Sequence, residues 1–537
     1  MKHLLYLIVG CLFIMACIIV VLPSRTPPTS HASLASTPSW TVSLPSSRPQ
    51  AQNTYDAIIV GGGFGGLSCG ALLAKDGYHV LVLEKNDQMG GYGSNDFQNG
   101  YTFSYGAQDI SGVWERGCIN YLLSCLNIDE QKLLVRNNRR FILNGEAIDI
   151  PAADNGFEKV FSERFPGQIQ AIHTFFTDAK TVYLEAFDKD VVKAWGIPLN
   201  NPLMTKTMPK EWLKRYDETH RLMIEWRKKT YREVLDEYFQ QDDIKTLLCS
   251  VLGYIGARAS KNSAYSVVVA SGYFFFGGYH ILGGSQHLAD CLAQYISDHH
   301  GTVLYQHPVD SIIVKNGAVQ GVKVVNTVFK APVVVSNVNA KTLYQDLVSD
   351  TDLPPKFMHD IDALPMGDSA FLVFLGSSEA FPTYPAIIND MDHRVHIIIN
   401  SHDDLLSAPL GSTSITIEQG AQMKDFPSTH SIGYERSITS LMTEMIDKAT
   451  LSLPGLKDHI VCKRSIAPRE LSQLTGIPQG AIYCFDQSQV PIRPYFKSPI
   501  AGLYLANASS SGGGVEAVVI GGITCKHDIT GWKKKMP

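Results

Sequence analysis

Residues 55–91 read YDAIIVGGGFGGLSCGALLAKDGYHVLVLEKNDQMGG, and this stretch decides the fold. It opens with the apolar run Ala57–Val60, which is short and rich in β-branched residues and therefore predicts a buried parallel strand. The glycine pattern Gly61-x-Gly63-x-x-Gly66 follows directly. In such a pattern the first glycine permits a tight turn, the second lets the backbone approach a pyrophosphate, and the third lets a helix pack against the strand.

The residues after these glycines complete a unit of strand, turn, helix and strand. A helical pattern runs to Gly77, and residues 79–83 form a second apolar strand that ends at Glu84. A helix N-terminus offers N–H groups and the positive end of its dipole to phosphates. Glu84 lies 23 residues after Gly61, where a carboxylate can accept hydrogen bonds from ribose hydroxyls. A purely structural glycine turn is the alternative, but these parts in register favour dinucleotide binding.

A second glycine pair helps to choose the dinucleotide. Gly90 and Gly91 follow Glu84 after five residues. This extended pattern resembles the one in FAD-binding oxidases of the amine oxidase and phytoene desaturase superfamily, and NAD-only Rossmann domains resemble it less. The resemblance implies FAD as the cofactor.

The composition is that of an ordinary globular protein. The chain has 537 residues, enough for two or three domains, with 45% hydrophobic and 18% charged residues. Its net charge of -5 gives no indication of nucleic-acid binding. The ten cysteines form no CxxC pair, which favours buried free thiols over metal or disulfide roles. We therefore expect no metal site and no nucleic-acid partner.

The N-terminus predicts association with a membrane. Residues 4–22 carry no charge and are about long enough to span a bilayer. An uncleaved single-pass anchor is favoured over a cleaved signal peptide or a lipoprotein signal, because the run is long and the nearest small-residue pattern is distant. Residues 23–54 are rich in Pro, Ser and Thr and predict a flexible tether.

Changes in pattern divide the rest of the chain. Helical patterns dominate from about residue 152 to 243, and residues 342–482 alternate helices with strands. The pairs Asn144-Gly145 and Asn316-Gly317 predict hairpin turns, and Ser285 is expected to cap the next helix. The predicted division is an anchor or signal sequence at 1–22, a linker at 23–54, an FAD-binding domain at 55–150, 285–345 and 491–537, and a substrate domain at 151–284 and 346–490.

Residues 247–284 are apolar and aromatic, with YFFF at 273–276 and Tyr279 close behind. A core segment and an apolar tunnel wall beside the cofactor are both compatible with this composition. The flanking glycines favour the tunnel wall, because a backbone that approaches a ring needs them.

A second glycine signature lies near the C-terminus. Residues 502–507 read GLYLAN and residues 511–515 read SGGGV, and an apolar stretch follows. A strand that enters a glycine loop and a helix N-terminus can hold the cofactor's pyrophosphate or ring carbonyl from the opposite side. A plain glycine turn is the alternative here too.

Two further stretches extend the resemblance. Residues 277–286, GGYHILGGSQ, with the Leu-Ala-Asp at 288–290, resemble the GGYYPxGGSQ-xLADAL stretch of carotenoid isomerases and retinol saturases. Residues 232–239, REVLDEYF, resemble the helix before their substrate channel. The chain thus resembles the phytoene desaturase-like superfamily over nearly all of residues 55–528. This implies an α/β fold, with a Rossmann-like FAD-binding domain of the glutathione reductase/amine oxidase type and a discontinuous α+β substrate domain.

The candidate site residues come from the glycine signatures and from the resemblance, which implies an adenine end near Glu84 and Val309. The cofactor-binding set is Gly61, Gly63, Gly65, Gly66, Glu84, Lys85, Gly90, Gly91, Val309, Asn507, Gly513, Gly514 and Val515. Positions that depart from the family pattern are Tyr92, Ser104, Asn507 and Ser511. No catalytic residue is assigned, and Tyr279 and His280 are candidates by position alone.

The function implied is that of an FAD-dependent oxidoreductase of the phytoene dehydrogenase-like type. It would desaturate, saturate or isomerise C–C or C=C bonds of a carotenoid, retinoid or related lipid, with an unidentified electron acceptor or donor. An amine oxidase and a non-catalytic flavin- or lipid-binding protein are the alternatives. Because a flavin supplies the redox chemistry, no catalytic His or Cys motif is required.

Overall fold

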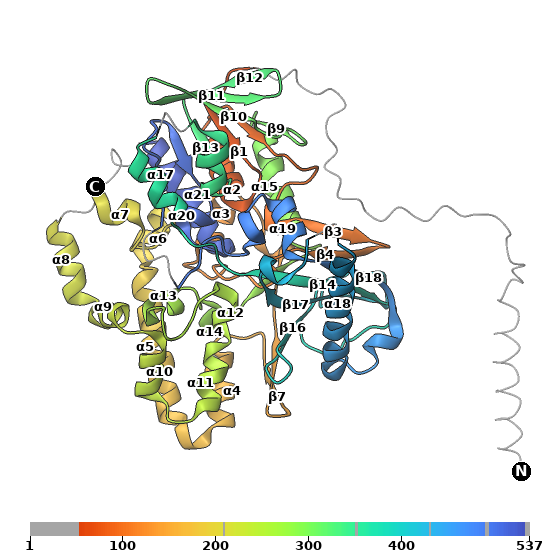
Figure 1. The fold of residues 1–537 in the computed structure, drawn as a ribbon. Helices are drawn as coiled ribbons and strands as arrows, with labels where there is room; N and C mark the ends of the chain where they lie inside the picture. Colours follow the sequence, from red (N-terminus) through yellow and green to blue (C-terminus); the bar gives the residue numbers. More distant parts are fainter. Residues whose placement is uncertain (1–52, 208–209, 350–352, 429–430, 489–492, 532–537) are drawn as a thin grey trace, which may run out of the picture. The chain divides into compact units, whose positions relative to one another are not determined.

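The computed structural model describes residues 53–207, 210–349, 353–428, 431–488 and 493–531. Within these ranges the chain builds two main sheets with helices packed against them (Figure 1). The expected membrane anchor at residues 4–22 and most of the tether lie outside the described residues. Among the residues that are described, no helix is both long and apolar enough to cross a bilayer.

The first sheet is parallel and has the strand order β19-β13-β1-β2-β9. Its strands are β1 (Ala57–Val60), β2 (Val80–Leu83), β9 (Thr302–Leu304), β13 (Val334–Ser336) and β19 (Leu503–Leu505). The strands predicted around the first glycine pattern are confirmed. Strands from three distant parts of the chain join this sheet. Neighbouring parallel strands need long crossover connections, which explains this arrangement.

Both faces of the parallel sheet are covered. Ile59 and Val82 pack on the side of the helices α2 (Phe64–Lys75), α15 (Gln286–Asp298) and α21 (Val515–Ile529). Their neighbours Ile58 and Leu81 belong to the opposite core, which a small antiparallel sheet closes. Successive side chains of a strand point to opposite faces, and burial of both explains the continuous apolar runs.

The small sheet joins β10 (Ser311–Lys315), β11 (Ala318–Val324) and β12 (Thr327–Lys330). Its first turn is the predicted Asn-Gly hairpin, because Asn316 and Gly317 have φ values of 54° and 71°. The prediction that Ser285 caps α15 is wrong. The Ser285 hydroxyl donates instead to the carbonyl of Gly106 at 3.0 Å, and the helix has no side-chain cap.

The second sheet is mixed and has the order β18-β14-β17-β16-β15-β6-β7. Its strands are β6 (Arg139–Leu143), β7 (Glu146–Ile150), β14 (Ser369–Ser377), β15 (Ile387–Asp390), β16 (Val395–Ile399), β17 (Thr413–Ala421) and β18 (Ile460–Ile466). All neighbours are antiparallel except β6 and β15. The predicted hairpin at Asn144-Gly145 is confirmed as β6–β7, and it extends this sheet rather than the parallel one.

The mixed sheet presents different side chains to its two faces. Phe371 and Val373 of β14 pack beneath the long helix α18 (Ile432–Ser452), seen beside the sheet in Figure 1. The alternate residues Ala370 and Leu372 face the other way, toward the hairpin of β3 (Asn95–Gln98) and β4 (Tyr101–Ser104). The face opposite α18 is therefore available to line a site.

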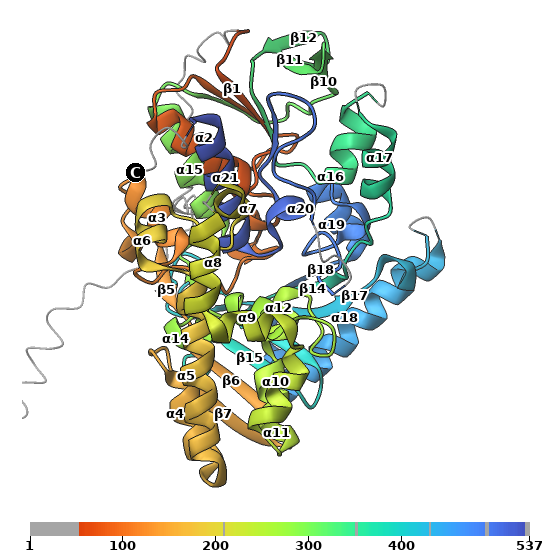
Figure 2. The same cartoon turned by 90° about the vertical axis from the view of Figure 1, so that its left-hand side faces the viewer.

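A helical layer, drawn in yellow to light green in Figure 2, makes up the region where helical patterns dominate the sequence. Its helices are α4 (Gly156–Arg164), α5 (Ile169–Ala186), α6 (Lys189–Trp195), α7 (Pro202–Thr207), α8 (Lys210–Thr219), α9 (Arg221–Lys228), α10 (Tyr231–Tyr238), α11 (Asp242–Cys249), α12 (Val251–Ile255), α13 (Ala264–Val269) and α14 (Tyr273–Phe276). Stacked and edge-on rings such as Phe175, Trp226 and Phe239 fill its core.

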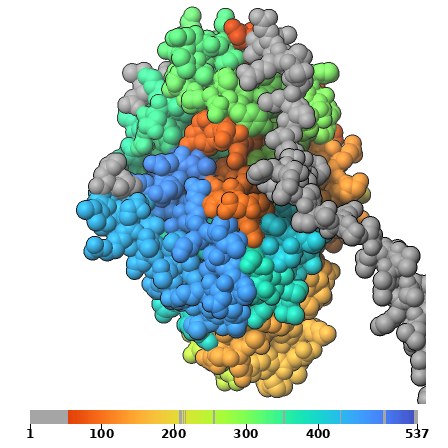
Figure 3. Space-filling model, turned by 90° about the vertical axis from the view of Figure 1, so that its right-hand side faces the viewer, coloured from red at the N-terminus to blue at the C-terminus, as the bar shows by residue number. Residues whose placement is uncertain are grey.

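Short elements connect these layers. They are α3 (Cys118–Cys125), β5 (Leu134–Arg136), β8 (Tyr279–Ile281), α16 (Ala340–Thr342), α17 (Pro355–Asp362), α19 (Pro468–Thr475) and α20 (Ala508–Ser511). In Figure 3 the orange surface of the early chain lies against the blue surface of the late chain. The contacts that join them include the ion pair of Arg464 with Asp96 at 2.7 Å and the hydrogen bond from the Asn86 amide to the Leu474 carbonyl at 2.9 Å.

Candidate functional site

The first glycine loop ends in a helix whose N-terminus is uncapped. Gly61 has a φ of +92°, so the turn after β1 uses a conformation that favours glycine. Gly63 is the N-cap of α2 and, as a glycine, has no side chain with which to cap this helix end. The Gly66 N–H donates to the Asn337 Oδ1 at 3.0 Å, which fixes the loop to the end of β13. Uncapped N–H groups at this end fit a pyrophosphate.

Glu84 lies at the end of β2 and turns back toward the same loop. Its Oε2 accepts a hydrogen bond from the Gly62 N–H at 2.7 Å, and its Oε1 accepts one from the Asn86 N–H at 2.9 Å. Burial raises the pKa of this carboxyl, while these two donors favour the ionised form. Each carboxylate oxygen keeps a further lone pair that can accept a ribose hydroxyl.

The second glycine pair reinforces the first loop. The Gly90 N–H donates to the Gly62 carbonyl at 2.7 Å, and Gly90 and Gly91 both have positive φ. Lys85 does not turn toward the glycines, because its Nζ donates to the Gln473 carbonyl at 2.7 Å. Val309 packs against the core beneath the small sheet.

The C-terminal signature builds a second uncapped helix end. Asn507 is the N-cap of α20, and its side-chain amide donates to the Val338 carbonyl at 2.6 Å. Gly514 has a φ of +100°, and α21 begins at Val515 without a side-chain cap. A Cβ on Gly522 would lie 2.4 Å from the Gly65 carbonyl, so α21 crosses close to the start of α2. Two helix N-termini therefore serve one site.

A cavity of about 1740 Å³ begins at these two helix ends and extends between the mixed sheet and the helical layer. The candidate residues that line it are Gly63, Gly65, Gly90, Gly91, Asn507, Gly513, Gly514 and Val515. Gly61, Gly66, Glu84, Lys85 and Val309 are not among its lining residues. Farther in, the wall includes Ala370 and Leu372 of β14, Val269 of α13, and Tyr273.

Most of the aromatic stretch is core. Phe274 and Phe275 are buried in the helical layer, and Phe276 stacks on Trp114 with ring centroids 3.9 Å apart. Only Tyr273 of this run lines the cavity. His280 is buried, and its Nδ1 lies 2.7 Å from the Asn137 Oδ1. Tyr279 and His280 are outside the cavity lining, which leaves them in structural positions.

Two of the positions that depart from the family pattern, Tyr92 and Ser104, form hydrogen bonds within the fold. The Tyr92 hydroxyl donates to the Gly480 carbonyl at 2.7 Å, at the edge of the cavity. The Ser104 hydroxyl donates to the Asn95 Oδ1 at 3.0 Å and accepts from the Ser285 N–H at 3.0 Å. In the described part of the chain, cysteines are free thiols and no cluster of three or more His, Cys, Asp or Glu could hold a metal ion.

Sequence reasoning missed Glu516, which lines the cavity in the first turn of α21. Its Oε1 accepts from the Cys118 N–H at 3.2 Å and its Oε2 accepts from the Ser111 hydroxyl at 3.0 Å. Gly112 leaves room for it, since a Cβ there would lie 2.4 Å from the Glu516 carboxyl carbon. A single acid directly after Val515, in an otherwise apolar stretch, was the available signal.

Comparison with known proteins agrees with this geometry. Residues 59–123 match the description of an NAD(P)-binding Rossmann-like domain. The chain is 25% identical to prolycopene isomerase 2 of an Oncidium hybrid cultivar, over 90% of this chain and 85% of that protein. It is 22% identical to 4,4'-diapophytoene desaturase of Methylomonas sp., over 80% and 85% of the two chains. It is 22% identical to all-trans-retinol 13,14-reductase of Danio rerio, over 88% and 85%.

The chain is a distant homologue of the prolycopene isomerases, phytoene desaturases and retinol saturases. This confirms the resemblance inferred from the sequence and the assignment to the phytoene dehydrogenase-like FAD-dependent oxidoreductases. Among solved structures, an oxidoreductase from Methanosarcina mazei aligns with a TM-score of 0.62 at 16% identity, covering 88% of this chain and 99% of that one. Putrescine oxidase aligns with a TM-score of 0.59 at 15% identity, over 89% and 99%. They confirm the Rossmann-like α/β fold with a mixed-sheet second part.

We expect Glu516 to make the stability of the protein depend on pH. Burial raises its pKa from 4.5 to about 7, so the folded protein keeps a proton that the unfolded chain loses above pH 4.5. The stabilisation is complete below that pH and is lost as the pH rises through about 7. The difference between the pKa values of Glu516 in the unfolded and folded protein corresponds to about 3 kcal/mol of unfolding free energy. We expect the wild type to lose about this much stability over that range relative to Glu516→Gln.

Denaturant unfolding of both proteins between pH 4 and pH 8 measures the difference. Glutamine retains the size of the side chain and cannot ionise, so it is the matched reference. Parallel pH profiles for the two proteins would show that Glu516 titrates normally in the folded state.

Proposed function

We propose that this chain binds FAD and changes C–C or C=C bonds of a carotenoid, retinoid or related polyisoprenoid lipid by desaturation, saturation or cis–trans isomerisation. The observation that carries the proposal is the continuity of the cavity from the two helix N-termini to the apolar face of β14. Its volume of about 1740 Å³ exceeds the usual range for a single small-molecule pocket, which ends near ~1000 Å³. The space accommodates a dinucleotide and a second, apolar molecule.

The residues of the glycine loops fit FAD. The uncapped starts of α2 and α21 can bind the pyrophosphate and a ring carbonyl, and Glu84 can accept ribose hydroxyls. Lys85 and Val309 support the adenine end indirectly, because neither residue lines the cavity. When bound, FAD supplies a ring that accepts or donates a hydride. The direction of transfer depends on its reduction potential and on the electron partner.

Part of the remaining cavity wall suits the apolar portion of a substrate. Ala370, Leu372 and Val269 offer apolar contacts, and Tyr273 adds an aromatic ring. Such a wall orients a polyene by shape and excludes water from the reacting bond. The curated relatives act on prolycopene, diapophytoene and all-trans-retinol according to their names, which supports a polyene for this chain as well. We also propose the discontinuous division into an FAD-binding and a substrate domain given above.

Product analysis tests the proposal. Flavin-loaded protein is incubated with carotenoids, retinol and, as a separate panel, polar amines, and the products are separated by chromatography. Loss or gain of two hydrogens, or a change of double-bond geometry, in a polyene supports the proposed reaction. Oxidation of amines alone would identify an amine oxidase, and no reaction with either panel would favour a binding protein.

We further propose that residues 4–22 attach the protein to a membrane and that residues 23–54 act as a spacer. The apolar run and the class of substrate support this. Deletion of residues 1–51 is expected to give a folded protein that moves from the membrane fraction to the soluble fraction, measured by sedimentation and by flavin content. A truncated protein that still sediments completely with membranes would mean that another surface attaches it.

A further inference from the structure

Four basic side chains line the cavity, three from the helical layer and one from the loop before β19. They are Lys206 of α7, Arg227 of α9, Lys261 and Arg493, and we call them the basic wall. Lys206 and Lys261 are exposed, so the cavity reaches solvent beside them, whereas Arg227 and Arg493 are partly buried. Among the residues that the structure describes, no carboxylate lies within 4.0 Å of any of these four cationic groups.

Neutral groups hold these cations in place. The Arg493 Nη1 donates to the Ala508 carbonyl at 3.1 Å, and its Nη2 donates to the Gln487 Oε1. The Arg227 guanidinium lies over the Tyr265 ring, 4.5 Å from the ring centroid. Carbonyls and rings fix the orientation of a cation without neutralising its charge, so the positive charge of the wall remains available.

Contacts link three members of the basic wall, Lys206, Lys261 and Arg493. The Asn262 side chain, next to Lys261, donates to the Gln487 carbonyl at 2.9 Å, and Gln487 also accepts from Arg493. The Lys206 ammonium lies 3.4 Å from the centroid of the Tyr495 ring, two residues from Arg493. These contacts bring the segments that carry Lys206, Lys261 and Arg493 together, and Arg227 lines the same cavity.

The acids that line the cavity are engaged elsewhere. Asp109 pairs with Arg139 at 2.9 Å, Glu418 contacts His396 at 2.8 Å, and Glu516 accepts its two hydrogen bonds near α3. A cleft with low-dielectric walls concentrates the field of unneutralised charges. Partly buried guanidinium groups without a counter-ion are costly, and an anionic ligand removes that cost.

We propose that the basic wall binds an oxyanion at one end of the lipid substrate, so that the substrate is an amphiphile with a polyene body and a carboxylate or phosphate head. This rests on the proposed function, whose apolar wall would hold the body. The planar guanidinium groups of Arg227 and Arg493 match the geometry of either head group. The alternative is that the basic wall binds an anionic membrane. Arg227 and Arg493 line the interior of the cavity, however, where a flat bilayer does not reach.

The test compares matched ligands by fluorescence titration of the full-length protein. The pairs are retinoic acid with retinol, and geranylgeranyl phosphate with geranylgeraniol, which separate the two sources of an oxyanion. We expect the acid or the phosphate to bind at least tenfold more tightly than its alcohol. Arg227→Gln and Arg493→Gln should each weaken only the anionic ligand, by roughly tenfold or more, as for a lost hydrogen bond to a charged group.

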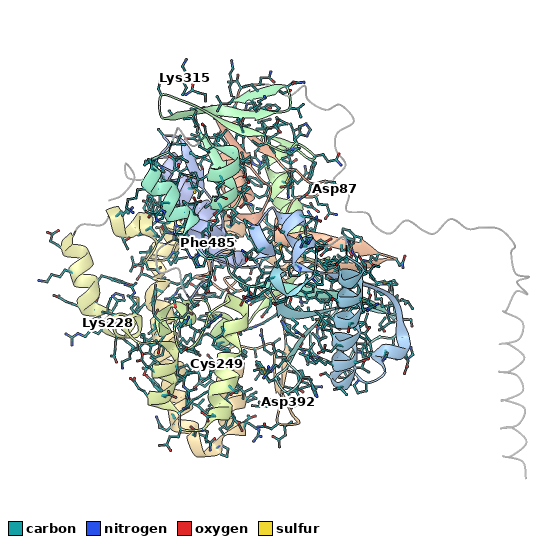
Figure 4. All side chains as sticks on the ribbon, viewed as in Figure 1. Asp87, Lys228, Cys249, Lys315, Asp392 and Phe485 are labelled. Carbon is teal, nitrogen blue, oxygen red and sulfur yellow. The ribbon has the colours of Figure 1, made fainter. Side chains whose placement is uncertain are left out.

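Lys228→Gln is the matched control. Lys228 follows Arg227 on α9, is exposed, and is not among the lining residues; it is labelled in Figure 4. This variant should bind every ligand as the wild type does.

Three results would overturn the inference without contradicting the proposed function. The first is equal affinity for acid and alcohol, which would leave the proposed function intact. The second is loss of flavin in the arginine variants with unchanged preference for the anion, which would assign the wall to the cofactor. The third is loss of binding to anionic phosphatidylserine vesicles without loss of ligand binding, which would assign it to the membrane. Failure of all four ligands to bind would instead contradict the proposed function and this inference with it.

Discussion

Replacement of Gly65 by alanine is expected to abolish dinucleotide binding and to destabilise the fold. A Cβ at position 65 would lie 2.2 Å from the Ala506 carbonyl oxygen and 2.9 Å from its carbon. Both atoms are backbone, so no side chain can move aside, and α2 or the end of β19 must shift. Because the start of α2 lines the site and the lining residue Asn507 directly follows Ala506, we expect flavin content to fall at least tenfold and stability to fall by about 3 kcal/mol.

Gly167→Ala provides the control, since a Cβ there meets nothing within 4 Å. It should retain full flavin content, with a change in stability below about 1 kcal/mol. Flavin content is measured by absorbance after release from purified protein, and stability by denaturant unfolding. A Gly65→Ala protein with normal flavin content and stability would show that the start of α2 and the end of β19 do not approach as closely as described.

The second large effect is expected from Arg139→Leu in β6. The Arg139 Nη2 lies 2.9 Å from the Asp109 Oδ2, and the two side chains are only 2% and 3% exposed. Asp109 also accepts from the Asn137 amide at 2.9 Å, which does not replace the lost positive charge. The variant leaves a buried carboxylate at the cavity without its counter-ion, which typically costs about 3–5 kcal/mol.

The neighbouring residue offers a matched comparison. Arg140 pairs with Asp149 at 2.6 Å, but the Asp149 side chain is 61% exposed. Arg140→Leu should therefore cost at most about 1 kcal/mol, as is usual for exposed pairs. Thermal and denaturant unfolding of both variants measure the two losses of stability. Equal losses of stability in the two would contradict the special role of the buried pair.

Local patterns explain why the cofactor half of the fold could be predicted from the sequence. Gly61 has a positive φ in a turn formed by neighbouring residues, and so do the hairpin turns at Asn144 and Asn316. A strand that is apolar throughout also indicates that both of its faces are buried. These signals need no knowledge of distant residues.

The remaining features depend on contacts between distant parts of the chain. The hairpin β6–β7 joins the mixed sheet through β15, more than two hundred residues later, and no local pattern encodes that pairing. Lys85 follows Glu84 directly, yet the Lys85 ammonium donates to the carbonyl of Gln473 in α19. Ser285 gives its hydroxyl to Gly106 instead of capping α15. In each case a partner remote in sequence decides what the side chain does.

An anaerobic titration of the flavin-loaded protein with a polyene, followed by flavin absorbance and by product analysis, tests the central claim most directly. We predict that a polyene bleaches oxidised flavin if the reaction is desaturation, or restores the absorbance of chemically reduced flavin if it is saturation. Isomerisation would give product isomers without a net redox change. Bleaching by amines, with no spectral or chemical response to any polyene, would contradict the proposed function.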